Sequence, residues 1–267
     1  MKGNKYLELV KGLSLINNKL EVIKHILGIS NKKTIIYSIK KGKISFEVPN
    51  LKKNRTTLLS IQEIFGREIY PIITNNDKII LDIGAQSGIF SIYAANKSRN
   101  SIIYAVEPEE GNFNQLKNNI KLNLLSKRIF TIKKALANRN GKINLYVNEK
   151  SSRAHNLYSG KGKSQIVDVI KIEDLLDDLK IKTCDIIKMD IEGAEYEVLF
   201  NCSKKILSKI KKIFLECHDI SNINSNYNEE KMKYFLSNNG FKIITAVGGI
   251  ILAENKLTSP SIPNPKV

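Results

Sequence analysis

Five side chains that could handle a proton or a charge lie within or just after two apolar runs of the sequence. Lys188, Asp190 and Glu192 belong to the first run, and Glu216 and His218 end the second. An imidazole titrates near neutral pH and is a natural general base, and a carboxylate can accept a proton or orient a hydroxyl. If the second run is a strand, its period of two places Glu216 and His218 on the same side. The set could therefore take a proton from an acceptor.

Each of these side chains also has a purely structural interpretation. Asp190 and Glu192 could cap the helix that follows, because acids favour a helix's first turn. Lys188 could pair with a neighbouring carboxylate, since lysine is almost never buried unpaired, and His218 could pack against a loop. Asp190, Glu192, Glu216 and His218 together could hold a divalent cation through oxygen and imidazole ligands. Nothing in their spacing demands a cation, so no metal site is predicted.

The segment Leu81–Gly88 has the pattern of a strand, a glycine turn and the start of a helix. Gly84 permits a tight turn and lets the backbone approach a ligand, and Gly88 allows close packing of the next helix. The full G-x-G-x-x-G spacing is absent, which disfavours a pyrophosphate cofactor. Any strand-to-helix turn can use glycine, so this turn alone does not identify a binding site.

Glu107 ends the next apolar run, in the sequence Val106-Glu107-Pro108, 23 residues after Gly84. An acid at that strand end is placed to accept hydrogen bonds from both ribose hydroxyls of a nucleoside. A charge at the end of an apolar strand is often just a solvated terminus. Because the glycine turn precedes it, we expect Glu107 to bind a ribose.

Four motifs in order resemble the FkbM-type family of class I methyltransferases. They are D-I-G-A with G-x-F-S (Asp82 to Ser91), E-P with later asparagines (Glu107 to Asn119), K-x-D-x-E-G-x-E (Lys188 to Glu195) and E-x-H (Glu216 to His218). The similarity covers about residues 60–220, and the third motif is the most specific. Asn138 stands where the family often has an acid, which leaves any polar contact there open.

The resemblance implies methyl transfer from S-adenosylmethionine, with S-adenosylhomocysteine as product, usually to a hydroxyl oxygen. By analogy with the family, the first acceptor to consider is a sugar hydroxyl of a glycan or glycoconjugate, or a small molecule. His218 is the preferred base, because His25 and His155 lie outside the matching motifs. The other residues expected to act on the methyl acceptor are Lys188, Asp190, Glu192 and Glu216. The residues implied for the cofactor are Asp82, Gly84, Ala85, Gln86, Ser87, Gly88, Glu107, Pro108 and Asp190.

The elements that must position these residues form an α/β pattern from Lys78 onwards. Short apolar runs alternate with helix-length segments, which indicates a parallel sheet covered on both faces. Together with the resemblance, this pattern predicts a doubly wound, Rossmann-like, seven-stranded class I methyltransferase sheet. The resemblance implies the strand order of that class, 3-2-1-4-5-7-6, with strand seven antiparallel. Residues 1–77 form a small α+β extension of helices and a hairpin, residues 78–256 the methyltransferase domain, and residues 257–267 a Pro-rich tail.

Within this pattern several boundaries are specific. Two short helices are predicted in residues 1–30 with a break near Asn17, and a hairpin over 34–48. Single helices are predicted over 58–70 and 194–209, and a single strand over 129–135. Residues 148–165 are predicted to form a polar loop between two strands, which could cover a substrate. A hairpin over 241–253 closes the sheet.

The sequence has 267 residues, a net charge of +17 and a 42% content of hydrophobic residues, which excludes a disordered chain. A basic balance raises nucleic acid first, but only six of the 43 basic residues are arginine, the residue favoured for phosphate and base contacts. Compositional drift, an RNA or phosphorylated partner, and peripheral contact with an anionic membrane all stay open. The alternatives to O-methylation are accordingly an RNA methyltransferase and a non-catalytic nucleoside-binding protein.

The three cysteines have neither disulfide nor zinc spacing. There is no apolar run long enough to span a bilayer, and the N-terminal residues do not resemble a signal sequence. These features lead us to expect a cytoplasmic protein.

Overall fold

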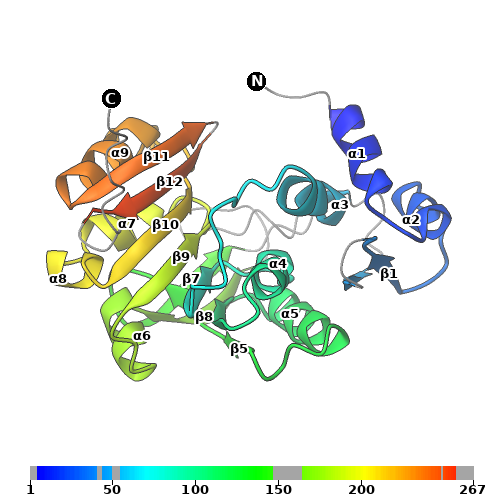
Figure 1. The fold of residues 1–267 in the computed structure, drawn as a ribbon, viewed down its shortest axis with the longest axis horizontal. Helices are drawn as coiled ribbons and strands as arrows, with labels where there is room; N and C mark the ends of the chain where they lie inside the picture. The colour runs from blue at the N-terminus through cyan, green and yellow to red at the C-terminus, as the bar shows by residue number, and fades with distance from the viewer. Residues whose placement is uncertain (1–4, 41–43, 50–54, 147–163, 248, 257–267) are drawn as a thin grey trace, which may run out of the picture.

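The computed structural model describes residues 5–40, 44–49, 55–146, 164–247 and 249–256. Its centre is a seven-stranded sheet in the order β11-β12-β10-β9-β3-β4-β5 (Figure 1). Counted along the chain, this is the predicted order 3-2-1-4-5-7-6, and β12 runs antiparallel to β10 as predicted. The strands are β3 Ile79–Ile83, β4 Ile102–Val106, β5 Ile129–Ile132, β9 Cys184–Met189, β10 Ile210–Glu216, β11 Phe241–Val247 and β12 Ile250–Asn255.

Helices cover both faces of this sheet because its central strands are apolar on both sides. Consecutive residues point to opposite faces, so Ile80 joins one hydrophobic cluster and Leu81 the other. The first cluster includes α4 Ile89–Lys97 and α5 Glu110–Leu122. The second includes α6 Ile172–Asp178, α7 Glu195–Phe200, α8 Lys204–Leu207 and α9 Glu229–Asn238. The predicted doubly wound α/β class is confirmed.

The N-terminal segment packs on the face that carries α4 and α5. It consists of α1 Lys5–Ser14, α2 Lys19–Ile26, the antiparallel pair β1 Thr34–Ser38 and β2 Ser45–Pro49, α3 Thr56–Ile61 and a π-helical turn, η1 Gln62–Gly66. Tyr37, Phe46 and Leu58 are fully buried in the same cluster as the sheet residues. The two predicted helices and the hairpin are therefore present, although residues 41–43 of its turn lie outside the described residues.

Side chains at the end of α5 hydrogen-bond the open edge of β2: Asn119 of the helix and Asn123, which caps its C-terminus. The Asn119 Oδ1 accepts a hydrogen bond from the Glu47 amide at 2.7 Å, and the Asn119 Nδ2 donates to the Ser87 carbonyl at 2.8 Å. Asn123 bonds both the amide and the carbonyl of Ser45. These bonds join the N-terminal hairpin to the turn that follows β3.

Three predicted elements differ from the structure. The helix predicted over 194–209 is two helices, because α7 ends at Phe200 and Ser203 caps a new start by accepting a hydrogen bond from the Ile206 amide. The strand predicted over 129–135 divides after Ile132. Its last residue begins β6 Ala135–Leu136, which joins β8 Ser164–Ile170 and β7 Gly141–Tyr146 in a separate sheet. The helix predicted over 58–70 becomes η1 after Ile61 and ends at Gly66.

Residues 148–163 of the predicted polar loop, and residues 257–267 of the predicted tail, lie outside the described residues. Ser164 and Gln165, which were predicted to end the loop, instead begin β8, where they pair with β7. Of the helices that the structure does describe, none is both long and apolar enough to cross a bilayer.

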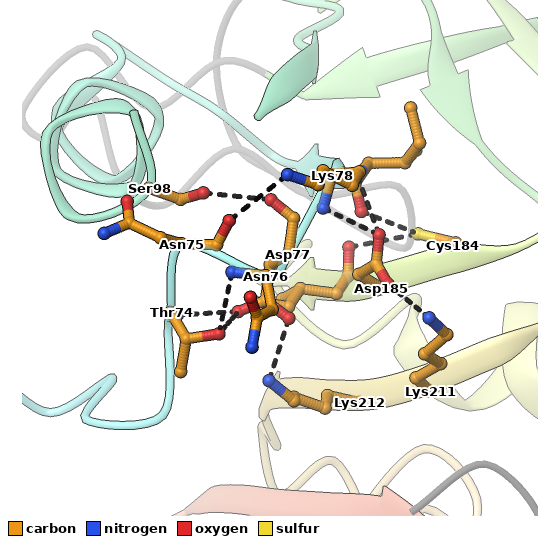
Figure 2. A network of polar contacts seen from close by, with 12 residues as sticks. Thr74, Asn75, Asn76, Asp77, Lys78, Ser98, Cys184, Asp185, Lys211 and Lys212 are labelled. Atoms are coloured by element: carbon orange, nitrogen blue, oxygen red, sulfur yellow. Dashed lines mark hydrogen bonds and ion pairs between the residues drawn. The ribbon is translucent and has the colours of Figure 1, made fainter. Parts of the chain in front are cut away.

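A network of polar contacts joins neighbouring strands at the amino-terminal edge of the sheet (Figure 2). The Asp185 carboxylate accepts hydrogen bonds from the backbone amides of Lys78 and Ile79 at 2.8 and 2.9 Å, and from the Lys211 ammonium at 2.6 Å. Burial alone would raise the pKa of Asp185, but the bond from Lys211 and the two amides lower it below its ordinary value. This network joins the starts of β3, β9 and β10, at the edge opposite the candidate site.

Candidate active site

The turn after β3 brings the end of β9 unusually close. Gly84 has a φ of 75°, and a Cβ there would lie 1.9 Å from the carbonyl oxygen of Asp190. Gly88 has a φ of 86°, and a Cβ there would lie 2.6 Å from the Leu116 Cδ1 of α5. Position 84 thus requires glycine for space as well as for conformation, because the obstacle is backbone. At Gly88 the obstacle is the end of the Leu116 side chain, so the positive φ is the stronger requirement. The turn lies directly against Asp190, so the two candidate regions form one site.

Glu107 lies at the end of β4, and two backbone amides hold its carboxylate. The Gln86 amide donates to its Oε2 at 2.8 Å and the Glu109 amide to its Oε1 at 2.9 Å. The side chain is buried, and burial raises the pKa of Glu107 to about 7 despite these hydrogen bonds. A buried carboxyl with fixed orientation and remaining lone pairs is well suited to hydrogen-bond two neighbouring hydroxyls.

A hollow of about 530 Å³, part of it open to solvent, adjoins Glu107 at the carboxyl ends of β3, β4 and β9. We call it the Glu107 pocket. It is lined by Ile83, Gly84, Gln86, Val106, Glu107, Pro108, Asn112, Lys134, Ala135, Leu136, Leu145, Asp190, Ile191 and Glu192. The predicted cofactor residues Gly84, Gln86, Glu107, Pro108 and Asp190 are therefore gathered around one hollow.

Sequence reasoning missed the opposite wall of the Glu107 pocket. Leu136 and Lys134 follow β5, and Leu145 comes from β7 of the three-stranded sheet. These residues carry no motif. The signal that could have found them is topological, because the residue range after β5 must lie beside the ends of β3 and β4 in a parallel sheet. Asn138, whose contact was left open, is not among the lining residues.

Asp82, also predicted for the cofactor, lies behind the site. It is fully buried, accepts a hydrogen bond from the Ser91 hydroxyl at 2.6 Å, and lies 3.4 Å from the Lys188 Nζ. The same ammonium donates to the Gly84 carbonyl at 3.0 Å and lies 3.6 Å from the Asp190 carboxylate. Burial opposes the charge of Lys188, but Asp82 and Asp190 outweigh it and raise the pKa of the ammonium. Lys188 is thus a permanent cation that holds β3, β9 and the glycine turn together.

A second hollow of about 440 Å³ lies on the other side of the glycine turn, and we call it the Glu216 pocket. It shares Gly84, Gln86 and Asp190 with the Glu107 pocket, so the two hollows meet at these residues. Its remaining lining consists of Ser60, Glu63, Ile64, Ile69, Tyr70, Ala85, Ser87, Ile89, Phe90, Lys188 and Glu216. Predicted residues Ala85, Ser87, Lys188 and Glu216 are found here, while Gly88 lines neither hollow.

Beyond β9, His218 lies between two glutamates. Its Nδ1 is 3.1 Å from the Glu195 Oε1, and its Nε2 is 3.5 Å from the Glu192 Oε2. Glu195 is fully buried and accepts hydrogen bonds from the amides of Ile191 and Gly193, each at 2.8 Å. The fixed Glu195 carboxylate therefore orients the imidazole so that its Nε2 faces Glu192.

These contacts change the protonation of both partners. Burial alone would lower the pKa of His218, but the hydrogen bond and charge of Glu195, helped by Glu192, raise it to about 9. Burial raises the pKa of Glu192 to about 7, against the effect of His218 and together with Asp190. Glu192 also has a φ of 56°, a conformation that non-glycine residues rarely adopt. At neutral pH the imidazole is therefore protonated, and Glu192 is the group poised to exchange a proton.

Three of the four side chains that could hold a divalent cation gather closely. Asp190, Glu192 and His218 each offer a ligand atom within 4.8 Å of the others, whereas Glu216 is not in this group. Carboxylate and imidazole donors fit a divalent cation. The protonated His218 and the Lys188 ammonium beside Asp190 both oppose one.

His25 belongs to the N-terminal segment, away from these groups, whereas Cys217 directly precedes His218. His25 is buried against the Tyr37 hydroxyl at 2.9 Å, and His155 is outside the described residues. The three cysteines are buried and form no disulfide, and burial raises their thiol pKa values. Buried, protonated thiols are poor nucleophiles.

Comparison with known proteins gives a family match. The sequence pattern of the methyltransferase FkbM domain matches residues 82–243, more than half of the chain. The chain is 25% identical over 213 residues to the AMB antimetabolite synthetase AmbE of Pseudomonas aeruginosa, over 64% of this chain and 10% of that protein, so it spans about a tenth of that relative. It is 24% identical over 180 residues to Methyltransferase 1 of Beauveria bassiana, over 59% of this chain and 72% of that one. The precorrin-6y C5,15-methyltransferase structure from Geobacter metallireducens aligns over 86% of this chain and 98% of that one, with 15% identity and a TM-score of 0.45.

Proposed function

The chain belongs to the FkbM methyltransferase family and is an S-adenosylmethionine-dependent enzyme, and from this premise we propose that it methylates a hydroxyl oxygen of a sugar or another polyhydroxylated acceptor. The observation that carries the proposal is the pair of hollows that meet at Gly84, Gln86 and Asp190. Methyl transfer needs donor and acceptor in separate compartments that touch at the reacting atoms.

The donor is assigned to the Glu107 pocket. Glu107 would accept hydrogen bonds from the two ribose hydroxyls, and the adenine ring would extend toward the apolar wall of Leu136 and Leu145. The methionine end would then lie near Asp190, where the pockets join. The Glu107 carboxyl is oriented before the cofactor arrives, since backbone amides already hold it.

The acceptor is assigned to the Glu216 pocket. Its polar lining includes Glu63, Glu216 and Asp190, and Tyr70 and Phe90 add aromatic surface. Carboxylates accept hydrogen bonds from vicinal hydroxyls, and aromatic rings pack against the apolar face of a sugar. The same carboxylates repel phosphates, which argues against RNA at this pocket in spite of the net charge of +17.

In the proposed step, the acceptor oxygen attacks the sulfonium methyl in line. The O–CH₃ bond forms while the S–CH₃ bond breaks, and S-adenosylhomocysteine leaves. The acceptor oxygen would reach the junction of the two pockets at Asp190, and its proton would pass to the carboxylate of Glu192, which lines the Glu107 pocket beside that junction. His218, protonated and held by Glu195, stabilises the ionised form of Glu192. His218, which the sequence favoured as the base, is in this proposal the partner of the base Glu192.

The test is transfer of labelled methyl from S-adenosylmethionine into separated glycans, lipids and RNA, followed by identification of the product. Glu216→Gln should raise the KM for the acceptor and leave the Kd of S-adenosylmethionine unchanged, whereas Glu107→Gln should weaken cofactor binding. Label found in RNA, with a steep loss of binding as salt rises, would refute the proposed acceptor. A Glu216→Gln enzyme with wild-type acceptor KM would refute the assignment of the pockets.

A further inference from the structure

Two apolar stripes remain exposed on the N-terminal helices. On α1 they are Tyr6, Leu7 and Val10. The second stripe consists of Leu20 and Ile23 of α2 and Leu27, the residue that caps its C-terminus. Their exposed fractions run from 36% to 78%. Spacings of three and four residues place each trio on one helical face. Six large apolar side chains exposed on two short helices and the cap of the second are a surface feature rather than scattered single residues.

The opposite faces of the same helices are fixed to the body of the protein. Leu9 of α1 and Val22 and Ile26 of α2 are buried in the cluster shared with α4 and α5. The helices lie at the end of the molecule remote from β11 and β12 (Figure 1). The protein therefore presents the two stripes outward from a stable support.

The charges around the stripes are predominantly positive. Residues 5–33 contain six lysines and two glutamates. Glu8 pairs with Lys11 at 3.1 Å, and Glu21 pairs with Lys32. Both acids are thus neutralised locally, and the excess of lysine remains. A helix with an apolar face and flanking lysines is suited to lie in the interface of an anionic bilayer.

We propose that α1 and α2 dock the enzyme on an anionic lipid surface, with the two stripes inserted at the level of the headgroups. The helices are ten and eight residues long, which fits lying on a bilayer rather than crossing it. Peripheral docking of this kind would hold the active site near acceptors carried by the membrane.

The test is co-sedimentation of the full chain with vesicles of phosphatidylcholine alone and of phosphatidylcholine mixed with phosphatidylglycerol. The wild-type protein should bind the mixed vesicles and lose binding as salt rises. Leu20→Gln with Leu27→Gln should lower the partition coefficient by about tenfold or more, because two apolar side chains no longer insert. Lys19→Gln with Lys24→Gln should lower binding to mixed vesicles by roughly fivefold for each lysine.

Tyr234→Gln is the matched control, since Tyr234 is 69% exposed on α9, far from the stripes, and binding should not change. Calorimetric titration of each variant with S-adenosylmethionine checks that it is folded. This control does not require the acceptor to be known. Wild-type protein that stays in the supernatant with both vesicles, or a leucine double variant that binds like wild type, would overturn the proposal. So would a wild-type dimer that the leucine substitutions make monomeric, because a second copy would then cover the face.

Discussion

The close approach of Gly84 to the end of β9 gives the sharpest test of the site. Gly84→Ala adds a Cβ that would lie 1.9 Å from the Asp190 carbonyl oxygen, where real contacts of this kind do not fall below 3.0 Å. The turn and the end of β9 must therefore separate by about 1 Å. Gly28→Ala is a matched control, because Gly28 has the same φ of 75° and nothing within 4 Å of its added Cβ.

The two variants separate conformational strain from steric strain. Both place alanine in the left-handed region, which costs about 1 kcal/mol. Gly84→Ala adds an overpacking term of about 1–3 kcal/mol, for about 2–4 kcal/mol in all. In a protein of this size, each kcal/mol lowers Tm by about 2–4 °C, so Gly28→Ala should lose about 2–4 °C and Gly84→Ala roughly 4–16 °C.

The functional consequences should diverge further than the stabilities. A shift of about 1 Å at the junction of the two pockets should lower kcat/KM by about a hundredfold in Gly84→Ala, and Gly28→Ala should keep wild-type turnover. Thermal unfolding followed by circular dichroism, and methyl transfer at a temperature where both variants are folded, measure the two effects. Equal Tm values and equal turnover in the two variants would show that the turn does not touch Asp190.

Three further predictions concern single carboxylates. Glu107→Gln should weaken S-adenosylmethionine binding by about 10- to 100-fold in calorimetry, because two charge-assisted hydrogen bonds of roughly 1.5–3 kcal/mol each are weakened; an unchanged Kd would exclude the ribose role. Turnover should rise with pH through about 7 as Glu192, whose pKa is raised to about 7, loses its proton; Glu192→Gln should remove that rise from the pH–rate profile, and a profile that keeps it would assign the base elsewhere. Asp185→Asn should lower the free energy of unfolding, measured in urea at pH 7, without changing turnover. The pKa of Asp185 is lowered in the folded protein, so its ionised carboxylate stabilises the fold at pH values above its pKa in the unfolded chain, about 3.9. That difference should shrink as the pH falls to about 3, and a constant difference would contradict the linkage.

The main strands of the sheet could be predicted from local sequence because each is a short apolar run, whereas their order was implied by the family resemblance. The segment Cys184–Met189, for example, is buried at every position, which only a central strand covered on both faces allows. The splitting of the helix predicted over 194–209 was not predictable from apolar spacing. It depends on Ser203 capping a new start, and a serine inside an amphipathic pattern does not by itself reveal whether it caps.

The residues of the candidate site that follow strands could be predicted from the sequence, but the residues that form the facing wall of the Glu216 pocket could not. Gly84, Glu107 and Asp190 follow strands, so topology alone places them at one edge of the sheet. The wall that Glu63 and Tyr70 contribute comes from the N-terminal segment and the residues that follow it, and no periodicity indicates which face that segment covers. Long-range packing decides it, through contacts such as those of Phe46 and Leu58 with the α4–α5 face.

Lysine–aspartate pairs at the two edges of the sheet show why residue type alone does not identify a functional carboxylate. At the amino-terminal edge, two backbone amides and Lys211 occupy the oxygens of Asp185 (Figure 2). At the carboxyl-terminal edge, Lys188 is shared between Asp82 and Asp190, and Asp190 faces both hollows. Asp185 and Asp190 lie at opposite ends of the same strand, β9, and each is close to a lysine. What distinguishes the functional carboxylate Asp190 from the structural carboxylate Asp185 is therefore the open space beside it. Gly84 and the N-terminal segment border that space.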